Sequence, residues 1–141
     1  MKKPIKKIWT STPQNKLAIN LTNSEKKEVS SNFQPLVEFL KDKCISENPD
    51  KKYNYLIDIY TKWYRKYFYL CEKFKSEFPD RIVDEFEVKL VRLEYTDKDS
   101  FDLSYLRHNE QWFLLAENQT LKNCIEMINE NTFLQPISEK T

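Results

Sequence analysis

The side chain best suited to acid–base chemistry in this sequence is His108, the single histidine of the chain. An imidazole can act as a general base when a carboxylate orients it, and Asp102 and Glu110 are close by in sequence. Nothing in the sequence places a cysteine beside His108, so no nucleophile–base pair is recognisable. The segment His108-Asn109-Glu110-Gln111 is typical of a turn, with Asn109 expected to adopt the positive φ. We therefore expect His108 to be a structural turn residue.

Three aspartates, Asp97, Asp99 and Asp102, form a D-x-D-x-x-D pattern whose oxygens could ligate Ca²⁺ or Mg²⁺. The glycine and the distal glutamate of a calcium-binding loop are missing, which favours a solvated turn whose aspartates bond the local backbone. One histidine and three scattered cysteines also lack the spacing of a zinc site. We expect neither a metal nor another cofactor.

The chain has 141 residues and no glycine. A phosphate-binding P-loop, a dinucleotide-binding fingerprint and a nucleophile elbow all need glycine for positive φ or close backbone approach, so these enzyme classes are excluded. Cys44, Cys71 and Cys124 each lie in an apolar-periodic segment, which is typical of buried reduced thiols. Met1–Lys7 is basic but no long apolar run follows it, so a cytoplasmic, non-membrane protein is expected. Because catalytic motifs are missing, we also expect the protein to be non-enzymatic.

Charge is distributed unevenly along the sequence. Residues 1–31 carry seven basic and two acidic side chains, net +5, residues 32–79 carry net +2, and residues 80–141 carry seven basic and thirteen acidic ones, net −6. Such asymmetry is typical of proteins that bind nucleic acid, an acidic partner or another copy of themselves. We read residues 1–31 as a basic N-terminal arm with apolar islands, one of which contains Trp9.

Hydrophobic periodicity predicts a single α+β domain over residues 32–141. Apolar residues at helical spacing predict a helix from Phe33 to about Ser46 and a second, much longer helix over 50–79, so that the two form a helix hairpin. Alternation after Pro79 then predicts a three-stranded antiparallel meander. Its first strand changes phase near Leu90 and Val91, which indicates either a bulge there or a strand buried on both faces.

The last part of the sequence predicts one more helix and an ordered end. Thr120 is the candidate N-cap of a C-terminal helix that carries Leu121, Cys124, Ile125 and Ile128 on its apolar face. Residues 133–137 are expected to lie back over the domain. The order of elements indicates helices packed on one face of an antiparallel sheet.

The predicted long helix would also display a polar face opposite its core face. That face combines tyrosines and cations: Tyr55, Lys62, Arg65, Lys66, Tyr69 and Lys73. One interpretation of this pattern is a solvated face on which lysine stems cover tyrosine rings. A second interpretation is a protein interface rich in Tyr and Arg. Phosphate attraction combined with base stacking is the third interpretation. With Trp9 of the arm, these residues are the candidate partner-binding site.

The leading hypothesis is a small non-enzymatic protein–protein interaction module, such as an adaptor, inhibitor or immunity-type protein. Its basic helix face and its acidic sheet region would be two surfaces of opposite sign that steer partners. The alternative is a nucleic-acid-binding accessory protein that uses the basic arm and the long-helix face. A homodimer is a further alternative for the partner.

Overall fold

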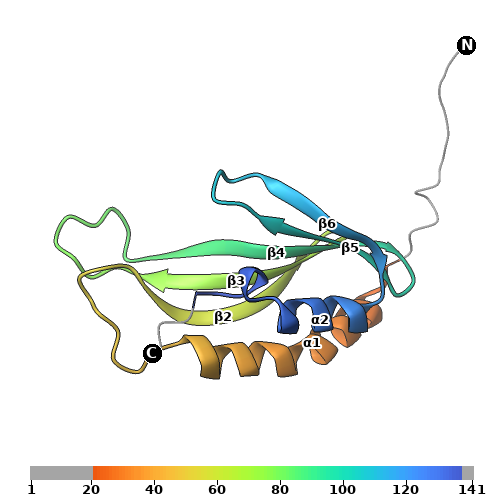
Figure 1. The fold of residues 1–141 in the computed structure, drawn as a ribbon, viewed down its shortest axis with the longest axis horizontal. Helices are drawn as coiled ribbons and strands as arrows, with labels where there is room; N and C mark the ends of the chain where they lie inside the picture. Colours follow the sequence, from red (N-terminus) through yellow and green to blue (C-terminus); the bar gives the residue numbers. More distant parts are fainter. Residues whose placement is uncertain (1–20, 138–141) are drawn as a thin grey trace, which may run out of the picture.

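Residues 21–137 form a five-stranded antiparallel sheet with two α-helices packed on one face. The computed structural model describes residues 21–137 (Figure 1). The elements in chain order are α1 (Asn23–Cys44), β2 (Tyr55–Tyr64), β3 (Tyr67–Lys75), β4 (Glu85–Asp97), β5 (Ser100–Leu106), β6 (Trp112–Gln119), α2 (Leu121–Glu130) and the short 3-10 helix η2 (Thr132–Leu134). The strands are ordered β2-β3-β4-β5-β6, so each pairs with its neighbour in sequence. The class is α+β, as predicted.

The predicted long helix over 50–79 is wrong, and with it the helix hairpin and the three-stranded sheet. Those residues form the β2–β3 hairpin, in which Tyr64 pairs with Tyr67 across a two-residue turn. The segment is so rich in aromatic and aliphatic residues that it satisfies the helical period and the strand period together. Its turn contains no glycine, because Arg65 adopts the positive φ of 55°.

Strands β4, β5 and β6 lie in the part of the sequence predicted to be strands, but they belong to a five-stranded sheet and not to a three-stranded meander. The pairing of β3 with β4 shifts register where Leu70 faces Val91 and Cys71 faces Lys89. Leu90 is therefore the extra residue of a β-bulge, which confirms the phase switch read from the sequence. Instead of standing alone, β4, β5 and β6 extend the sheet begun by the β2–β3 hairpin.

Helix α1 begins before the residue at which periodicity placed it. Thr22 and Glu25 form a capping box, in which each side chain accepts a hydrogen bond from the other residue's backbone N–H. The sequence boundary between residues 31 and 32 therefore falls inside this helix. Pro35 lies within the helix and is exposed.

The C-terminal helix is confirmed, including its N-cap. The Thr120 hydroxyl accepts a hydrogen bond from the Asn123 amide at 3.1 Å. Asp99, in the β4–β5 turn, accepts another from the Leu121 amide at 3.0 Å. The first turn of α2 is thus tied to the sheet as well as to its own cap.

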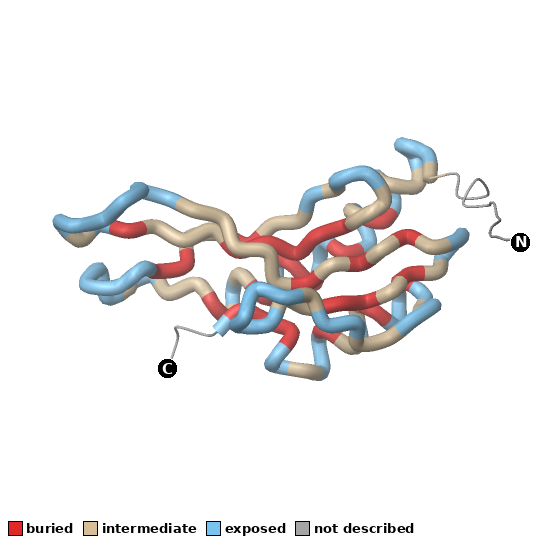
Figure 2. Tube along the Cα trace, turned by 90° about the horizontal axis from the view of Figure 1, so that it is seen from above, coloured by how far each residue is buried: buried red, intermediate tan, exposed pale blue. Residues whose placement is uncertain are grey.

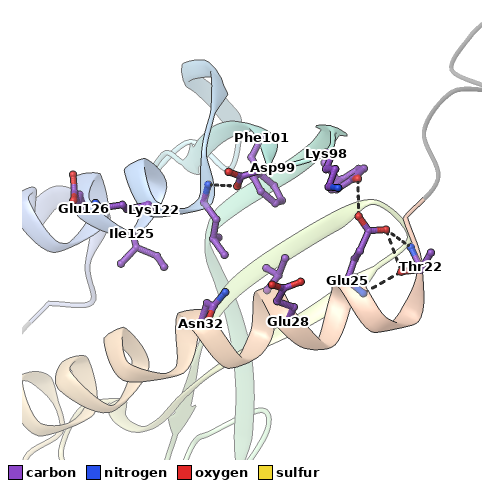
Figure 3. A pocket seen from close by; sticks show the side chains of 13 residues that line it. Thr22, Glu25, Glu28, Asn32, Lys98, Asp99, Phe101, Lys122, Ile125 and Glu126 are labelled. Atoms are coloured by element: carbon purple, nitrogen blue, oxygen red, sulfur yellow. Dashed lines mark hydrogen bonds between the residues drawn. The ribbon is translucent and has the colours of Figure 1, made fainter.

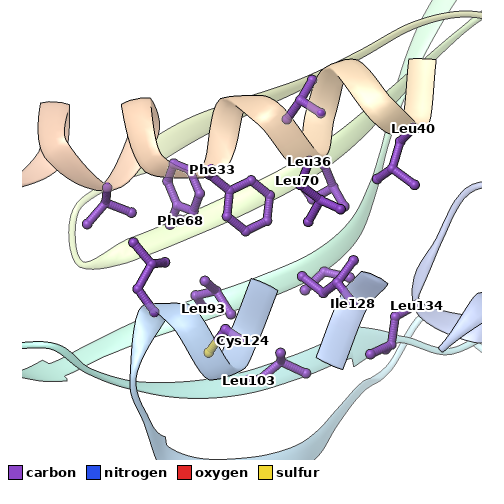
Figure 4. Packing of buried hydrophobic residues seen from close by; sticks show 14 of the residues in the cluster. Phe33, Leu36, Leu40, Phe68, Leu70, Leu93, Leu103, Cys124, Ile128 and Leu134 are labelled. Atoms are coloured by element: carbon purple, nitrogen blue, oxygen red, sulfur yellow. The ribbon is translucent and has the colours of Figure 1, made fainter. Parts of the chain in front are cut away.

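The hydrophobic core lies between the two helices and the sheet (Figure 4). Phe33 of α1 meets Phe68 of β3 edge to face, with ring centroids 5.2 Å apart. Buried stretches gather along the middle of the molecule, while the connections at its ends are exposed (Figure 2). The middle of the core face of the sheet is therefore used for packing.

The end of the chain closes this core, as predicted. Leu134 is fully buried, and the Gln135 side-chain amide donates hydrogen bonds to the Ile128 and Asn129 carbonyls at the end of α2. Lys43 of α1 donates to the Gln135 side-chain oxygen at 2.7 Å. Gln135 thus joins the two helix ends.

Candidate interaction surface

The opposite face of the sheet is covered by no helix within residues 21–137, and we call it the open face. Strand alternation and register assign its side chains. They are Tyr60, Lys62, Tyr67, Tyr69, Cys71, Lys73, Glu85, Glu87, Lys89, Arg92, Glu94, Asp102, Ser104, Trp112 and Leu114. Charged and aromatic residues dominate this set, in contrast to the apolar core face.

Opposite charges meet across the strands of the open face. Lys62 of β2 and Glu87 of β4 are 2.7 Å apart, and Lys73 and Glu85 are 3.5 Å apart. Lys66, in the β2–β3 turn, lies 2.8 Å from Glu94. The expected separation into a basic surface and an acidic surface is therefore wrong, because the sheet brings both onto one face and pairs them.

Glu87 is the most connected carboxylate of this face. It accepts a hydrogen bond from the Tyr60 hydroxyl, and Lys89 lies 3.6 Å away in addition to Lys62. Burial alone would raise the pKa of Glu87, but hydrogen bonds from Lys62 and Tyr60 outweigh it and the pKa is lowered. Burial, with the hydrogen bond to Glu87, raises the pKa of Tyr60. The cluster therefore stabilises the charged form of the Glu87 carboxyl and the neutral form of the Tyr60 hydroxyl.

Arg92 is held by aromatic rings instead of a carboxylate. Its guanidinium carbon lies 4.9 Å from the ring centroid of Tyr67 and 4.6 Å from that of Trp112. Trp112 in turn lies 6.0 Å from Tyr69. The Arg92 Nε is buried without a hydrogen-bond partner, and the side chain forms no ion pair within the described part of the chain. The guanidinium is thus fixed in direction and unneutralised.

Beside Arg92 and Trp112 lies the free edge of the sheet. β6 is an edge strand, and its residues 112–116 are Trp-Phe-Leu-Leu-Ala, without a charge. Phe113 is 41% exposed and Leu114 is 48% exposed. The other edge strand, β2, is accompanied by α1, and Lys41 of α1 lies 3.3 Å from Asp58. We call Arg92, Trp112, Phe113 and Leu114 together the β6 surface.

The residues predicted to bind a partner are only partly brought together. Lys62, Tyr69 and Lys73 lie on the open face, but the Tyr69 ring is buried beneath the Lys89 ammonium, which lies 5.4 Å from its centroid. Arg65 and Lys66 form the β2–β3 turn. Tyr55 is buried at the start of β2, where its hydroxyl donates to Glu77. Trp9 lies outside the described residues.

The prediction missed all four residues of the β6 surface. A signal existed, because five consecutive apolar residues without a charge are unusual for a strand that faces solvent at an edge. Recognising β6 as an edge required the order of the sheet. Arg92 carried no local signal, since its aromatic partners come from β3 and β6.

The aspartates, the histidine and the cysteines that were candidates for metal binding or catalysis lie in turns, in strands or in buried positions. The Asp97 carboxylate accepts a hydrogen bond from the neighbouring Lys98 amide, as the turn interpretation predicted. Asp99 and Asp102 accept instead from the Leu121 and Asn118 amides, which are distant in sequence, and Asp102 lies in β5. His108 is exposed in the β5–β6 turn, where Glu110, not Asn109, adopts the positive φ.

Cys44, Cys71 and Cys124 are buried thiols, as predicted. No group of three or more potential metal ligands occurs within residues 21–137.

Fold and surface together define a small α+β domain with a helix-covered core and an exposed apolar sheet edge. Residues 30–135, about three quarters of the chain, match the family model of a domain of unknown function, DUF3024. The chain belongs to this family. Neither the curated proteins nor the solved structures gave a significant match. Across residues 21–137, neither helix is long and apolar enough to cross a bilayer.

Proposed function

We propose that this protein is a non-enzymatic protein–protein interaction module that binds its partner through the β6 surface. The observation that supports this most directly is the uncharged, partly exposed stretch 112–116 of the edge strand β6. Natural edge strands are usually protected by charges, prolines or covering elements. An edge that lacks these features can accept a partner strand by main-chain hydrogen bonding.

The side chains of β6 offer contacts on both faces of an added strand. Phe113 lies opposite Tyr105 on the core face, and Leu114 lies opposite Ser104 on the open face. Phe133 continues the apolar surface on the helix side, with its ring 5.4 Å from that of Tyr105. Backbone pairing would supply affinity and these alternating side chains would supply specificity.

Arg92 and Trp112 have the properties of an energetic hot spot at this edge. Trp, Tyr and Arg are the residue types that dominate measured interface energies. The two stacked rings restrict the Arg92 guanidinium before any partner arrives, which reduces the entropy lost on binding. An unneutralised guanidinium favours a carboxylate on the partner.

The proposal is tested by site-specific cross-linking. A photoreactive phenylalanine analogue replaces Phe113 in one sample and Phe39, an exposed residue of α1, in the control. In host lysate at low salt, a partner should cross-link from position 113 and not from position 39. Absence of any product specific to position 113 contradicts the proposal.

Affinity then identifies the contact residues. With the purified partner, Arg92→Ala and Leu114→Lys should each weaken binding at least about tenfold, the scale of a hot-spot loss. Phe39→Ala should leave the affinity unchanged. If both β6-surface variants bind like the wild type, the partner uses another surface.

A second candidate function, single-stranded nucleic-acid binding, is favoured by the placement of tyrosines and lysines on a sheet. Sheets are the usual platforms for base stacking, whereas a helix face was expected from the sequence. The ion pairs to Glu85, Glu87 and Glu94 oppose this function, since phosphates must compete with them. The test is fluorescence anisotropy with oligonucleotides at about 50 mM salt. Affinity that falls with salt and with Lys66→Glu supports it, and flat titrations exclude it.

A further inference from the structure

A groove runs between α1 and α2, on the side of the molecule that carries the helices (Figure 3). Its volume is about 960 Å³, within the usual range of ligand-binding pockets. The β4–β5 turn borders it with Lys98 and Asp99. Its apolar lining comes from three parts of the fold: Val29 of α1, Tyr95 and Phe101 of the sheet, and Leu121 and Ile125 of α2.

Acidic side chains outnumber basic ones around this groove. Four acids and two lysines line it, a net charge of −2. Two of the acids have structural partners, since Glu25 belongs to the capping box and Asp99 binds the Leu121 amide. The other two, Glu28 of α1 and Glu126 of α2, form no ion pair within residues 21–137. A cationic, partly apolar ligand would suit this lining.

The chain itself carries such a segment in the sequence that precedes Thr22. Thr22 lines the groove, and the residues just before it lie outside the described part of the chain. Residues 1–20 contain five lysines and no acid, together with the apolar pair Ile8-Trp9. The groove follows α1 from Thr22 to Asn32, about 15 Å of helix. The stretch between Trp9 and Thr22 can span roughly 40 Å, so the reach is sufficient.

We propose that residues 1–20 bind in this groove of their own molecule, with Trp9 and Ile8 on its apolar lining and lysines near Glu28 and Glu126. Val29 and Phe101 are already buried, whereas Ile125 is half-buried, so covering Ile125 removes apolar surface from water and favours binding. The lysines add an attraction that salt weakens. Because the segment is tethered, its effective concentration at the groove is high, so weak contacts suffice. This site is distinct from the β6 surface.

The experiment uses the full-length chain and methyl NMR signals of Val29 and Ile125. An indole ring close to these methyl groups displaces their signals, so Trp9→Ala should shift them. Glu126→Lys should shift the same signals in the same direction by releasing the segment. Glu130→Lys makes the same charge change on α2 outside the groove and should leave them in place. Raising the salt to about 0.5 M should act like Glu126→Lys.

Two results overturn the proposal. If Trp9→Ala leaves the Val29 and Ile125 methyl signals unmoved, the segment does not occupy the groove. If the wild-type signals change with protein concentration, the groove is filled by the segment of a second copy. Trypsin cleavage after Lys16 is an independent readout, expected to be several-fold faster in Glu126→Lys than in Glu130→Lys, because cleavage follows the population of the open form.

Discussion

Single charged residues on the open face act mainly as members of pairs. Exposed ion pairs typically stabilise a fold by about 0–1 kcal/mol each, so the pairs of Lys66 and Lys73 contribute little. Glu87 differs because it combines two lysines with the Tyr60 hydroxyl. The lowered pKa of its carboxyl shows that the folded state favours the charged form.

We expect Glu87→Gln to destabilise the fold near pH 7 and not in acid. A carboxyl whose folded pKa lies below its unfolded pKa contributes stability above the unfolded pKa of about 4.3, and that contribution is lost as pH falls through the folded pKa. The free energy of unfolding of Glu87→Gln at pH 7 should be lower than that of the wild type by less than about 1 kcal/mol, since the carboxylate is partly exposed. Urea unfolding at pH 7 and near pH 3 measures it. A difference that does not shrink in acid contradicts this role of the charge.

Connections between the strands depend on residues that replace glycine. Arg65, Asp99 and Glu110 in the turns, and Asn118 inside β6, adopt φ between 49° and 64°. A non-glycine residue in this region costs roughly 1–2 kcal/mol. The hairpins are therefore held in shape by the pairing of their strands.

Arg65→Gly should stabilise the protein by up to about 1 kcal/mol. Glycine removes the cost of the positive φ but loses more conformational entropy on folding, so part of the gain is offset. Arg65→Val is the matched control and should destabilise the fold, because a β-branched residue is strongly disfavoured at this φ. Thermal unfolding of the three proteins measures both effects. Arg65→Gly less stable than Arg65→Val would contradict the assignment of strain to this turn.

At the scale of the whole molecule, one core connects all the elements. Cys44 at the end of α1 and Cys124 in α2 belong to this core, whereas Cys71 in β3 is buried on the open face of the sheet. Burial raises the pKa of Cys71 to about 11 and also raises that of Cys124. The thiolate is the reactive form of cysteine. These groups are therefore protected twice, because they are buried and because their raised pKa keeps them as neutral thiols.

We expect Cys71 and Cys124 to react with a disulfide reagent near pH 8 only when the fold opens. Their rates of modification should fall by orders of magnitude relative to the protein in denaturant, following the opening equilibrium. Absorbance of the released thiolate measures the reaction, and mass spectrometry assigns each site. Immediate modification of Cys124 in the native protein would show that the core is not closed as described, and immediate modification of Cys71 would show that the open-face side chains do not cover it.

Local patterns in the sequence were enough for the parts of the fold whose signals lie within a few residues. The α2 helix with its Thr120 cap, the bulge at Leu90 and the bond from the Lys98 amide to Asp97 are such cases. Each depends on a side chain that bonds nearby backbone, or on an alternation that is broken within one strand. These features of the protein were predictable without its tertiary structure.

The sequence by itself determined an α+β domain with a closing helix, buried thiols and no glycine-dependent site. Only the tertiary structure decided that residues 55–75 pair as strands, because their aromatic pattern fits both periods and the choice depends on pairing with β4. That pairing set lysines of β2 and β3 against glutamates of β4 and left β6 as the exposed edge. Partners distant in sequence carry no local signal, so the candidate surface emerged only when the sheet was assembled.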